Sequence, residues 1–197
     1  MIVCSSLDDP QVAALLHQGK VGIIPTDTIY GVVASADNEQ AVERLYQLKQ
    51  RRDDARSGTV IAANIQQLID FGVDEQVVRG VEHLWPNPLS IELPLENNFA
   101  YLFQSGPHRA FRVVADPRVA KLLQETGMLL TSSANRSGHP PAATVAEAKE
   151  YFGDQVDFYV DGGDLSDRPP STVAVIRSGK LHVVRPGAVT IVDDRED

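Results

Sequence analysis

Four short loops of this sequence carry the residues whose types and spacing could do chemistry. Each loop places hydroxyls, an amide or a fixed cation at the end of a predicted strand or helix, where open α/β folds bind their ligands. Taken singly, ordinary turns, solvated charges and sheet-edge ion pairs explain most of these residues equally well. In chain order the loops are Thr26-Asp27-Thr28-Ile29-Tyr30, then Lys49-Gln50-Arg51-Arg52 with Arg56, then Thr131 to Gly138, and finally Pro170-Ser171-Thr172 with Arg185-Pro186-Gly187.

The second loop gathers cations in an otherwise acidic chain. Lys49 offers a point charge and Arg51 a planar fork, a combination that suits a phosphate beside a carboxylate. Each charge-assisted hydrogen bond would contribute roughly 1.5–3 kcal/mol. A helix C-terminus with solvated charges, partly paired with Asp53 and Asp54, explains the same residues equally well.

The third loop sets hydroxyls, a carboxamide and Gly138 directly after a predicted buried strand. Hydroxyls and N–H groups in such a turn can cradle phosphate oxygens. The sequence contains neither a Gly-x-x-x-x-Gly-Lys-Ser/Thr loop nor a Gly-x-Ser-x-Gly elbow, and His139 has no evident acid partner. A nucleotide in this region would therefore bind without a Walker motif, and a serine nucleophile is disfavoured. In the first loop Asp27 either does chemistry or caps its own turn, and we favour the structural role.

Composition and charge narrow the class of protein. The net charge of −9 opposes non-specific binding to nucleic acid. The single cysteine, Cys4, cannot form an internal disulfide, and the five histidines show no zinc-ligand spacing with it. No apolar run approaches the roughly 20 residues that span a bilayer, and Met1 to Asp8 lacks a secretion-type pattern. We expect a cytoplasmic protein with no membrane contact and no protein-held metal site.

Hydrophobic patterning predicts the elements that must position the loops. Helices are expected at 9–18, from a cap at Asp37 or Asn38 to about 50, at 65–71 and 75–84, from Asp116-Pro117 to about 127, and from the capping box at Thr144 to about 152. Strands are expected at 1–4, 21–24, 59–63, 89–93, 100–104, 110–114, 128–130, 158–160, 172–176 and 181–184, with Tyr30-Gly31 as a turn. Several strands are too close together for crossover helices, which indicates a mixed sheet. We expect one α/β domain over residues 1–197, with its core at about 9–187 and a charged tail at 190–197.

In their order, the four loops resemble the YrdC-like family, the threonylcarbamoyl-AMP synthases, from about Val21 to Gly187. The resemblance implies a twisted, open mixed sheet with flanking helices and a large concave cavity (YrdC/RibB-like). The implied reaction joins L-threonine, bicarbonate and ATP into threonylcarbamoyl-adenylate and pyrophosphate, for the t6A37 modification of tRNA. The matching segments are Pro25 to Gly31, Lys49-x-Arg51, Ser132-Ser133-Ala134-Asn135-x-Ser137-Gly138, Ser171-Thr172-Val173 and Arg185-Pro186-Gly187.

The same resemblance implies roles for individual residues. Catalysis falls to Lys49, Arg51, Ser133 and Asn135; nucleotide binding to Arg51, Arg56, Ser133, Asn135, Pro141 and Arg185; threonine binding to Thr28, Lys49, Arg112, Thr131 and Ser171. Magnesium would accompany ATP, and tRNA with t6A-pathway proteins would be partners.

This sequence departs from the family pattern in a few places, most notably in the loop after Arg51. Arg52 stands where proline is usual, and Arg56 replaces a cation expected one position earlier, at Ala55. Asn87, Ser90 and Val32-Val33 also differ from the usual residues. Two alternatives therefore stay open: an RNA-binding or accessory paralogue with reduced or different activity, and a paralogue that processes another nucleotide or carbamoyl compound.

Overall fold

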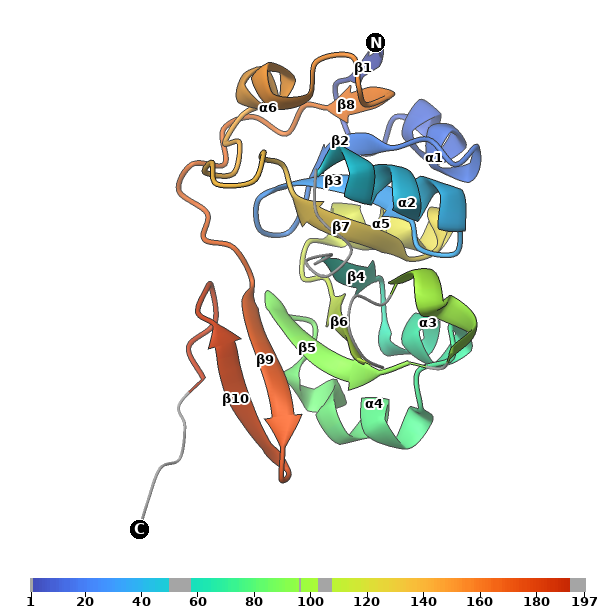
Figure 1. Ribbon diagram of the computed structural model, residues 1–197, viewed down its shortest axis with the longest axis vertical. Coiled ribbons are helices and arrows are strands. Elements are labelled where there is room, and N and C mark those ends of the chain that lie inside the picture. Colours follow the sequence, from blue (N-terminus) through green and yellow to red (C-terminus); the bar gives the residue numbers. More distant parts are fainter. Residues whose placement is uncertain (1, 50–57, 96, 103–107, 192–197) are drawn as a thin grey trace.

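Among the residues that the computed structural model describes (2–49, 58–95, 97–102 and 108–191), ten strands form one mixed sheet (Figure 1). Their order is β1-β8-β2-β3-β7-β4-β6-β5-β9-β10. The pairs β1–β8, β2–β8, β4–β6 and β5–β9 are parallel, and the other neighbours are antiparallel. The strands are β1 (Ile2–Cys4), β2 (Gly22–Pro25), β3 (Tyr30–Ser35), β4 (Thr59–Ala62), β5 (Leu89–Pro94), β6 (His108–Val113), β7 (Leu129–Ser133), β8 (Phe158–Val160), β9 (Thr172–Arg177) and β10 (Lys180–Arg185).

Helices cover both faces of this sheet, and their starts follow the predicted capping signals. The side chain of Asn38 caps the second helix by accepting a hydrogen bond from the Ala41 N–H at 3.0 Å. Asp9, Asp116 and Thr144 cap their helices in the same way. No helix in the described part of the chain is long and apolar enough to cross a membrane. The helices are α1 (Pro10–His17), α2 (Glu39–Leu48), α3 (Ile65–Asp70), α4 (Glu75–Val81), α5 (Pro117–Thr126) and α6 (Val145–Phe152), with 3-10 turns η2 (Glu82–Leu84) and η3 (Asn97–Leu102).

Consecutive strand residues enter two separate cores, as the period of two in a strand requires. Val60 and Leu130 belong to the core beneath α2, α3, α4 and α6. Ile61 and Leu129 belong to the core beneath α1 and α5. Along this second face the side chains change from apolar to polar. On β7, for example, Leu129 lies in the core, whereas Thr131, the next residue on the same face, lines a cleft. The same face is thus apolar beneath two helices and polar beyond them, which positions the site described below.

Two of the predicted elements are wrong. Tyr30-Gly31 is not a turn: it begins β3, where Gly31 pairs with Ile24 on one side and Ser133 on the other. The turn lies earlier, between β2 and β3, so the first loop is the tip of a hairpin. The glycine at position 31 suggested a turn. In the structure its missing side chain instead lets β3 lie close to Thr131 on β7, because a Cβ at Gly31 would lie 2.3 Å from the Thr131 hydroxyl oxygen.

The strand predicted at 100–104 is also wrong, because its described residues form part of η3. The Tyr101 hydroxyl donates to the Ala36 carbonyl at 2.9 Å, and the Phe99 ring stacks on Phe71 with centroids 4.1 Å apart. A short apolar run does not reveal whether it packs as a strand or as a helical turn. A tight turn at Ser178-Gly179, with φ of +50° and +75°, joins β9 to β10.

Candidate functional site

A cleft of about 510 Å³ opens on the sheet face beyond α1 and α5. Its lining comes from the β2–β3 turn, the start of β3, and from β4, β5, β6, β7, β9 and β10. This volume lies within the range of small-molecule sites. Six residues predicted from the sequence line it: Thr28, Arg112, Thr131, Ser133, Ser171 and Arg185. Three of the four chemistry-bearing loops therefore meet in one hollow.

Arg112 and Asp27 form a buried ion pair at the cleft. The Arg112 Nη2 donates to Asp27 Oδ1 at 2.8 Å, and the two side chains are 3% and 1% exposed. Asp27 also accepts from the Ala115 N–H at 3.3 Å, so the hairpin turn is attached to the end of β6. The Arg112 Nε is buried and has no hydrogen-bond partner. Asp27 thus holds the guanidinium in the cleft wall while leaving donor capacity for a ligand.

A chain of hydroxyls connects Arg112 to the fourth loop. Ser90 is fully buried at its centre, where its Oγ contacts the Thr59 hydroxyl at 3.3 Å and the Ser171 hydroxyl at 3.2 Å. The Arg112 Nη1 lies 3.4 Å from the same Ser90 oxygen. Arg185 completes the series, with its Nη2 donating to the Ser171 carbonyl at 2.9 Å and lying 3.2 Å from the Ser171 Oγ. A ligand that displaces one of these groups would therefore also change the hydrogen bonds of the others.

The hairpin tip folds around its own hydroxyls. The Thr26 Oγ1 donates to the Ile29 carbonyl at 2.7 Å, accepts from the Thr28 N–H at 3.2 Å and lies 3.1 Å from the Thr28 Oγ1. These local bonds fix the turn without help from solvent. Both threonines line the cleft, so the turn presents a rigid pair of hydroxyl groups to it.

Lys49 joins the second predicted loop to the third. Its ammonium group, at the C-terminal end of α2, donates to the Ser133 carbonyl at 2.6 Å, the Asn135 carbonyl at 2.5 Å and the Asn135 Oδ1 at 2.8 Å. Lys49 is 1% exposed, and these acceptors match the number of its N–H groups. The Ser133 Oγ donates to the same Asn135 oxygen at 2.7 Å. Within this geometry Lys49 holds the turn that follows β7.

Two further predicted residues, Asn135 and Pro141, are not among the described residues that line the cleft. Asn135 is half-buried behind Ser133 and donates from Nδ2 to the His139 carbonyl at 2.6 Å. Pro141 is exposed in the following segment. Arg51 and Arg56 lie outside the described residues.

Several cleft residues escaped prediction, and Arg109 is the most informative. It is 4% exposed, lines the cleft and donates from Nη2 to the Tyr46 hydroxyl at 3.0 Å. Burial lowers the pKa of Arg109, while the nearby Tyr46 and Glu92 oppose that shift. Glu92 and His108 also line the cleft. Arg109 precedes the strand predicted at 110–114, and nothing in the local sequence distinguishes it from an exposed loop arginine.

Tyr30 fixes a neighbouring loop rather than entering the chemistry. Its hydroxyl donates to the Gly163 carbonyl at 2.9 Å and accepts from the Gly162 N–H at 2.8 Å. Burial is the main cause that raises the pKa of Tyr30 above its ordinary value. A neutral phenol can do both jobs, whereas a phenolate could not donate.

Comparison with known proteins identifies the class of this chain. The Sua5–YciO–YrdC family, described as "Telomere recombination", matches residues 14–187. The chain belongs to this family. Its mixed α/β fold matches E. coli YciO with a TM-score of 0.78 at 23% identity, over 94% of this chain and 93% of that one.

Relatives with curated names narrow the class further. The threonylcarbamoyl-AMP synthase of Pseudoalteromonas translucida is 35% identical over 172 residues, which is 84% of this chain and 91% of the relative. A putative threonylcarbamoyl-AMP synthase of Mycobacterium tuberculosis is 30% identical over 178 residues, 89% of this chain and 82% of the relative. These relatives indicate a nucleotidyltransferase-type enzyme.

One of the similar solved structures is a complex with an amino acid. P. abyssi Sua5 complexed with L-threonine matches with a TM-score of 0.84 at 25% identity, over 95% of this chain. This chain spans 58% of the length of that protein.

Proposed function

We propose that this chain is a threonylcarbamoyl-AMP synthase, which condenses L-threonine, bicarbonate and ATP into threonylcarbamoyl-adenylate and pyrophosphate. The names of its relatives and the threonine complex of P. abyssi Sua5 support the proposal. The observation that carries it is the meeting of Arg112, the cleft hydroxyls and Ser133 in one hollow of about 510 Å³. Such a cleft can hold an amino acid beside a nucleotide.

In this proposal the Arg112 end of the cleft binds threonine. The unpartnered Nε of Arg112 supplies a donor for the amino-acid carboxylate. Thr28, Thr131 and Ser171 line the same cleft and offer hydroxyls to the threonine side chain and amine. Because Asp27 already neutralises part of the Arg112 charge, a single carboxylate suits this end better than a polyphosphate does.

The turn after β7 binds ATP in the same proposal. Ser133 and Arg185 line the cleft, and Asn135 supports Ser133 from behind. Lys49 acts by fixing the Ser133 and Asn135 carbonyls, so its contribution to catalysis is the shape of this turn. Arg51, Arg56 and Pro141 keep their proposed roles as further nucleotide contacts, and magnesium enters with ATP as part of the substrate.

The proposed chemistry runs in two balanced steps. The threonine amine and bicarbonate form a carbamate with loss of water. A carbamate oxygen then attacks the α-phosphorus of ATP, a new P–O bond forms, and the bond to the bridging oxygen breaks so that its electron pair leaves with pyrophosphate. Holding both substrates together replaces an improbable encounter by an intramolecular one, and fixed cations stabilise the charge on the phosphoryl oxygens.

The proposed product is a reactive mixed anhydride, which must be consumed soon after its release. We assign it to the t6A37 modification of tRNA, with tRNA and t6A-pathway proteins as downstream partners. This assignment depends on the same proposal.

The decisive experiment measures pyrophosphate release by the purified chain with ATP, magnesium, bicarbonate and L-threonine. We expect release that requires threonine and an adenylate product whose mass includes threonine and one carbon from bicarbonate. Pyrophosphate release that is independent of threonine, or absent, would contradict the proposal. Arg112→Met should raise the KM for threonine about tenfold or more, while Arg177→Met, a matched loss of charge at an exposed site, should not.

One observation favours the alternative of an RNA-binding or accessory protein. The β9–β10 hairpin carries Arg177 and Lys180, both exposed and paired across the two strands, and it contains no acidic residue in a chain of net charge −9. A local basic surface of this kind suits a phosphate backbone. Salt-sensitive RNA binding by a chain that makes no threonine-dependent pyrophosphate would favour this alternative.

A further inference from the structure

Arg109 is a buried cation that forms no ion pair within the described part of the chain. It lies on β6, is 4% exposed and lines the cleft. Its Nη2 donates to the neutral hydroxyl of Tyr46 at 3.0 Å, and its Nε is buried with no hydrogen-bond partner. A guanidinium has five N–H donors, and the Nε–H of Arg109 is one that a ligand could still use.

The described surroundings of Arg109 do not balance its charge. Among the described residues Arg109 forms no ion pair, whereas Arg112 on the same strand has Asp27 at 2.8 Å. The charge of Glu92 acts to raise the pKa of Arg109, but none of the described hydrogen bonds joins the two side chains. A buried cation beside a neutral partner is costly, and that cost is offset once an anion occupies the space next to it.

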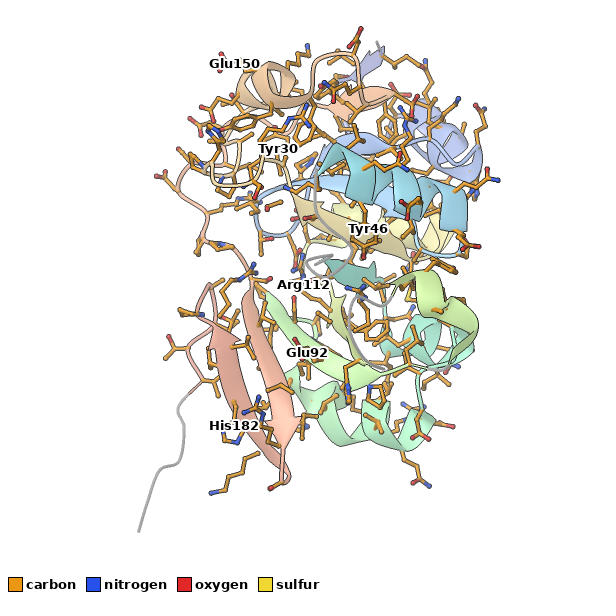
Figure 2. The ribbon with its side chains drawn as sticks, in the orientation of Figure 1. Tyr30, Tyr46, Glu92, Arg112, Glu150 and His182 are labelled. Atoms are coloured by element: carbon orange, nitrogen blue, oxygen red, sulfur yellow. The ribbon has the colours of Figure 1, made fainter. Side chains whose placement is uncertain are left out.

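The position of Arg109 points to the nucleotide end of the cleft. Its partner Tyr46 lies on α2, one helical turn before Lys49. Lys49 in turn fixes the Ser133 and Asn135 carbonyls, on the turn proposed to face ATP. In Figure 2, Tyr46, Arg112 and Glu92 follow one another down the molecule, with Tyr46 at the α2 end. The Arg109 side chain leaves β6 on the same face as Phe111, which belongs to the core beneath α2, so Arg109 reaches the site from the α2 side of the sheet, opposite the face that carries Arg112.

We propose that Arg109 is a further binding residue of this site, which donates to a phosphate oxyanion of the nucleotide and of the pyrophosphate that leaves. The inference rests on the proposed function for the identity of the nucleotide, and it adds a contact that the family resemblance does not imply. The opposing explanation is that Arg109 is a structural clamp, which serves only to hold Tyr46 and α2 against β6.

Calorimetric titration of the full chain with inorganic pyrophosphate separates the two explanations. Arg109→Met keeps the apolar stem and removes the charge, so we expect pyrophosphate to bind about 10- to 100-fold more weakly. Arg109→Lys keeps the charge without the planar fork and should fall between Met and the original chain. Arg79→Met is the matched control, because it removes one exposed arginine on α4, away from the cleft.

The same titrations with L-threonine test whether the effect is specific. We expect threonine affinity to be unchanged in all three variants, and the thermal unfolding midpoint of Arg109→Met without ligand to equal or exceed that of the original chain. Pyrophosphate affinity unchanged in Arg109→Met would overturn the inference. Two other results for Arg109→Met would also overturn it: an equal loss of threonine and pyrophosphate affinity, or a lowered unfolding midpoint with unchanged pyrophosphate binding. Each is the result expected if Arg109 is only a structural clamp.

These results are distinguishable from a failure of the proposed function. Threonine-dependent pyrophosphate release by the original chain tests the function, and pyrophosphate binding tests Arg109. A chain that binds pyrophosphate through Arg109 but makes no adenylate would keep the oxyanion contact and lose the synthase assignment. A chain that does not bind pyrophosphate at all would overturn the Arg109 inference, whatever its activity.

Discussion

Arg112 and Arg109 lie on the same strand and are equally buried, yet their surroundings differ. Arg112 is 3% exposed and meets the carboxylate of Asp27 at 2.8 Å. Arg109 is 4% exposed and meets the neutral hydroxyl of Tyr46 at 3.0 Å. Because they are an odd number of residues apart on a strand, their side chains leave the sheet on opposite faces.

The difference separates a cation that belongs to the fold from one that is left for a ligand. Asp27 joins the β2–β3 turn to β6 through Arg112, so this pair shapes the cleft before any substrate arrives. Tyr46 gives Arg109 a direction but no opposite charge. Removing the partner should therefore cost much more stability at Arg112 than at Arg109.

The largest expected effect is that of Asp27→Asn, which leaves the Arg112 charge buried without a counter-ion. We expect the free energy of unfolding to fall by about 3–5 kcal/mol. Tyr46→Phe, the matching change at Arg109, removes the described hydrogen bond between Arg109 and the neutral Tyr46 hydroxyl and should cost about 1 kcal/mol. Urea unfolding of the two variants checks the comparison, and equal losses would show that Asp27 is not a structural partner.

Lys49 extends the comparison to a third buried cation, one whose described hydrogen bonds go to carbonyl oxygens. Lys49→Met leaves the Ser133 and Asn135 carbonyls without their donor, so we expect a loss of about 2–3 kcal/mol and a large fall in kcat. Lys49→Arg should recover little, because a planar fork cannot place its donors where a compact ammonium does.

Lys121→Met provides the surface control for Lys49. Lys121 pairs with Asp8 at 2.6 Å while 69% exposed, and such pairs contribute about 0–1 kcal/mol. If Lys49→Met proved as mild as Lys121→Met in urea unfolding, the turn after β7 would not depend on Lys49.

Gly31→Ala probes the Arg112 side of the cleft without touching the ion pair. The added Cβ would lie 2.3 Å from the Thr131 hydroxyl oxygen, so Thr131 must move. We expect a loss of about 1–3 kcal/mol and a higher KM for threonine. Gly80→Ala in α4 is the control, because a Cβ there meets nothing within 4 Å, and it should stabilise by up to about 1 kcal/mol. A variant Gly31→Ala with an unchanged KM would remove Thr131 from the proposed threonine site.

The sequence predicted the elements with strong local signals. The Asp116-Pro117 start of α5 and the Thr144 cap of α6 were found because a cap and its first turn are adjacent in the chain. The strand β3 was missed because Gly31, an apparent turn residue, is required by Thr131 on a strand about 100 residues away. A contact of this kind leaves no local trace.

For the site, as for the fold, the sequence predicted individual residues but not the distant residues that they contact. Loop residues that match the family pattern, such as Ser171 and Arg185, were identified, and they line the cleft with Arg112. Their partners were not: the contact of Arg109 with Tyr46 joins positions 63 residues apart. Likewise the sequence predicted that Lys49 would act on a ligand, while the structure shows its ammonium on the carbonyls that follow β7. Partners are set by packing, which residue types alone do not reveal.

The smallest expected effect comes from two tyrosines that behave unlike Tyr46. Tyr46 accepts from a cation, whereas the Tyr101 and Tyr159 hydroxyls donate to the carbonyls of Ala36 and Gly153 at 2.9 and 2.7 Å. Burial raises the pKa of Tyr101 and of Tyr159 to about 12, against about 10 in an unfolded chain.

Folding therefore favours the neutral form of both phenols, and their contribution to stability is complete below about pH 10 and lost as the pH rises toward about 12. Ultraviolet titration of the folded chain should show phenols that ionise near pH 12, and Tyr101→Phe and Tyr159→Phe should each remove one. If every tyrosine titrated near pH 10 while the chain stayed folded, burial would not favour the neutral forms of Tyr101 and Tyr159, and the two hydroxyls would contribute nothing to the pH dependence of stability.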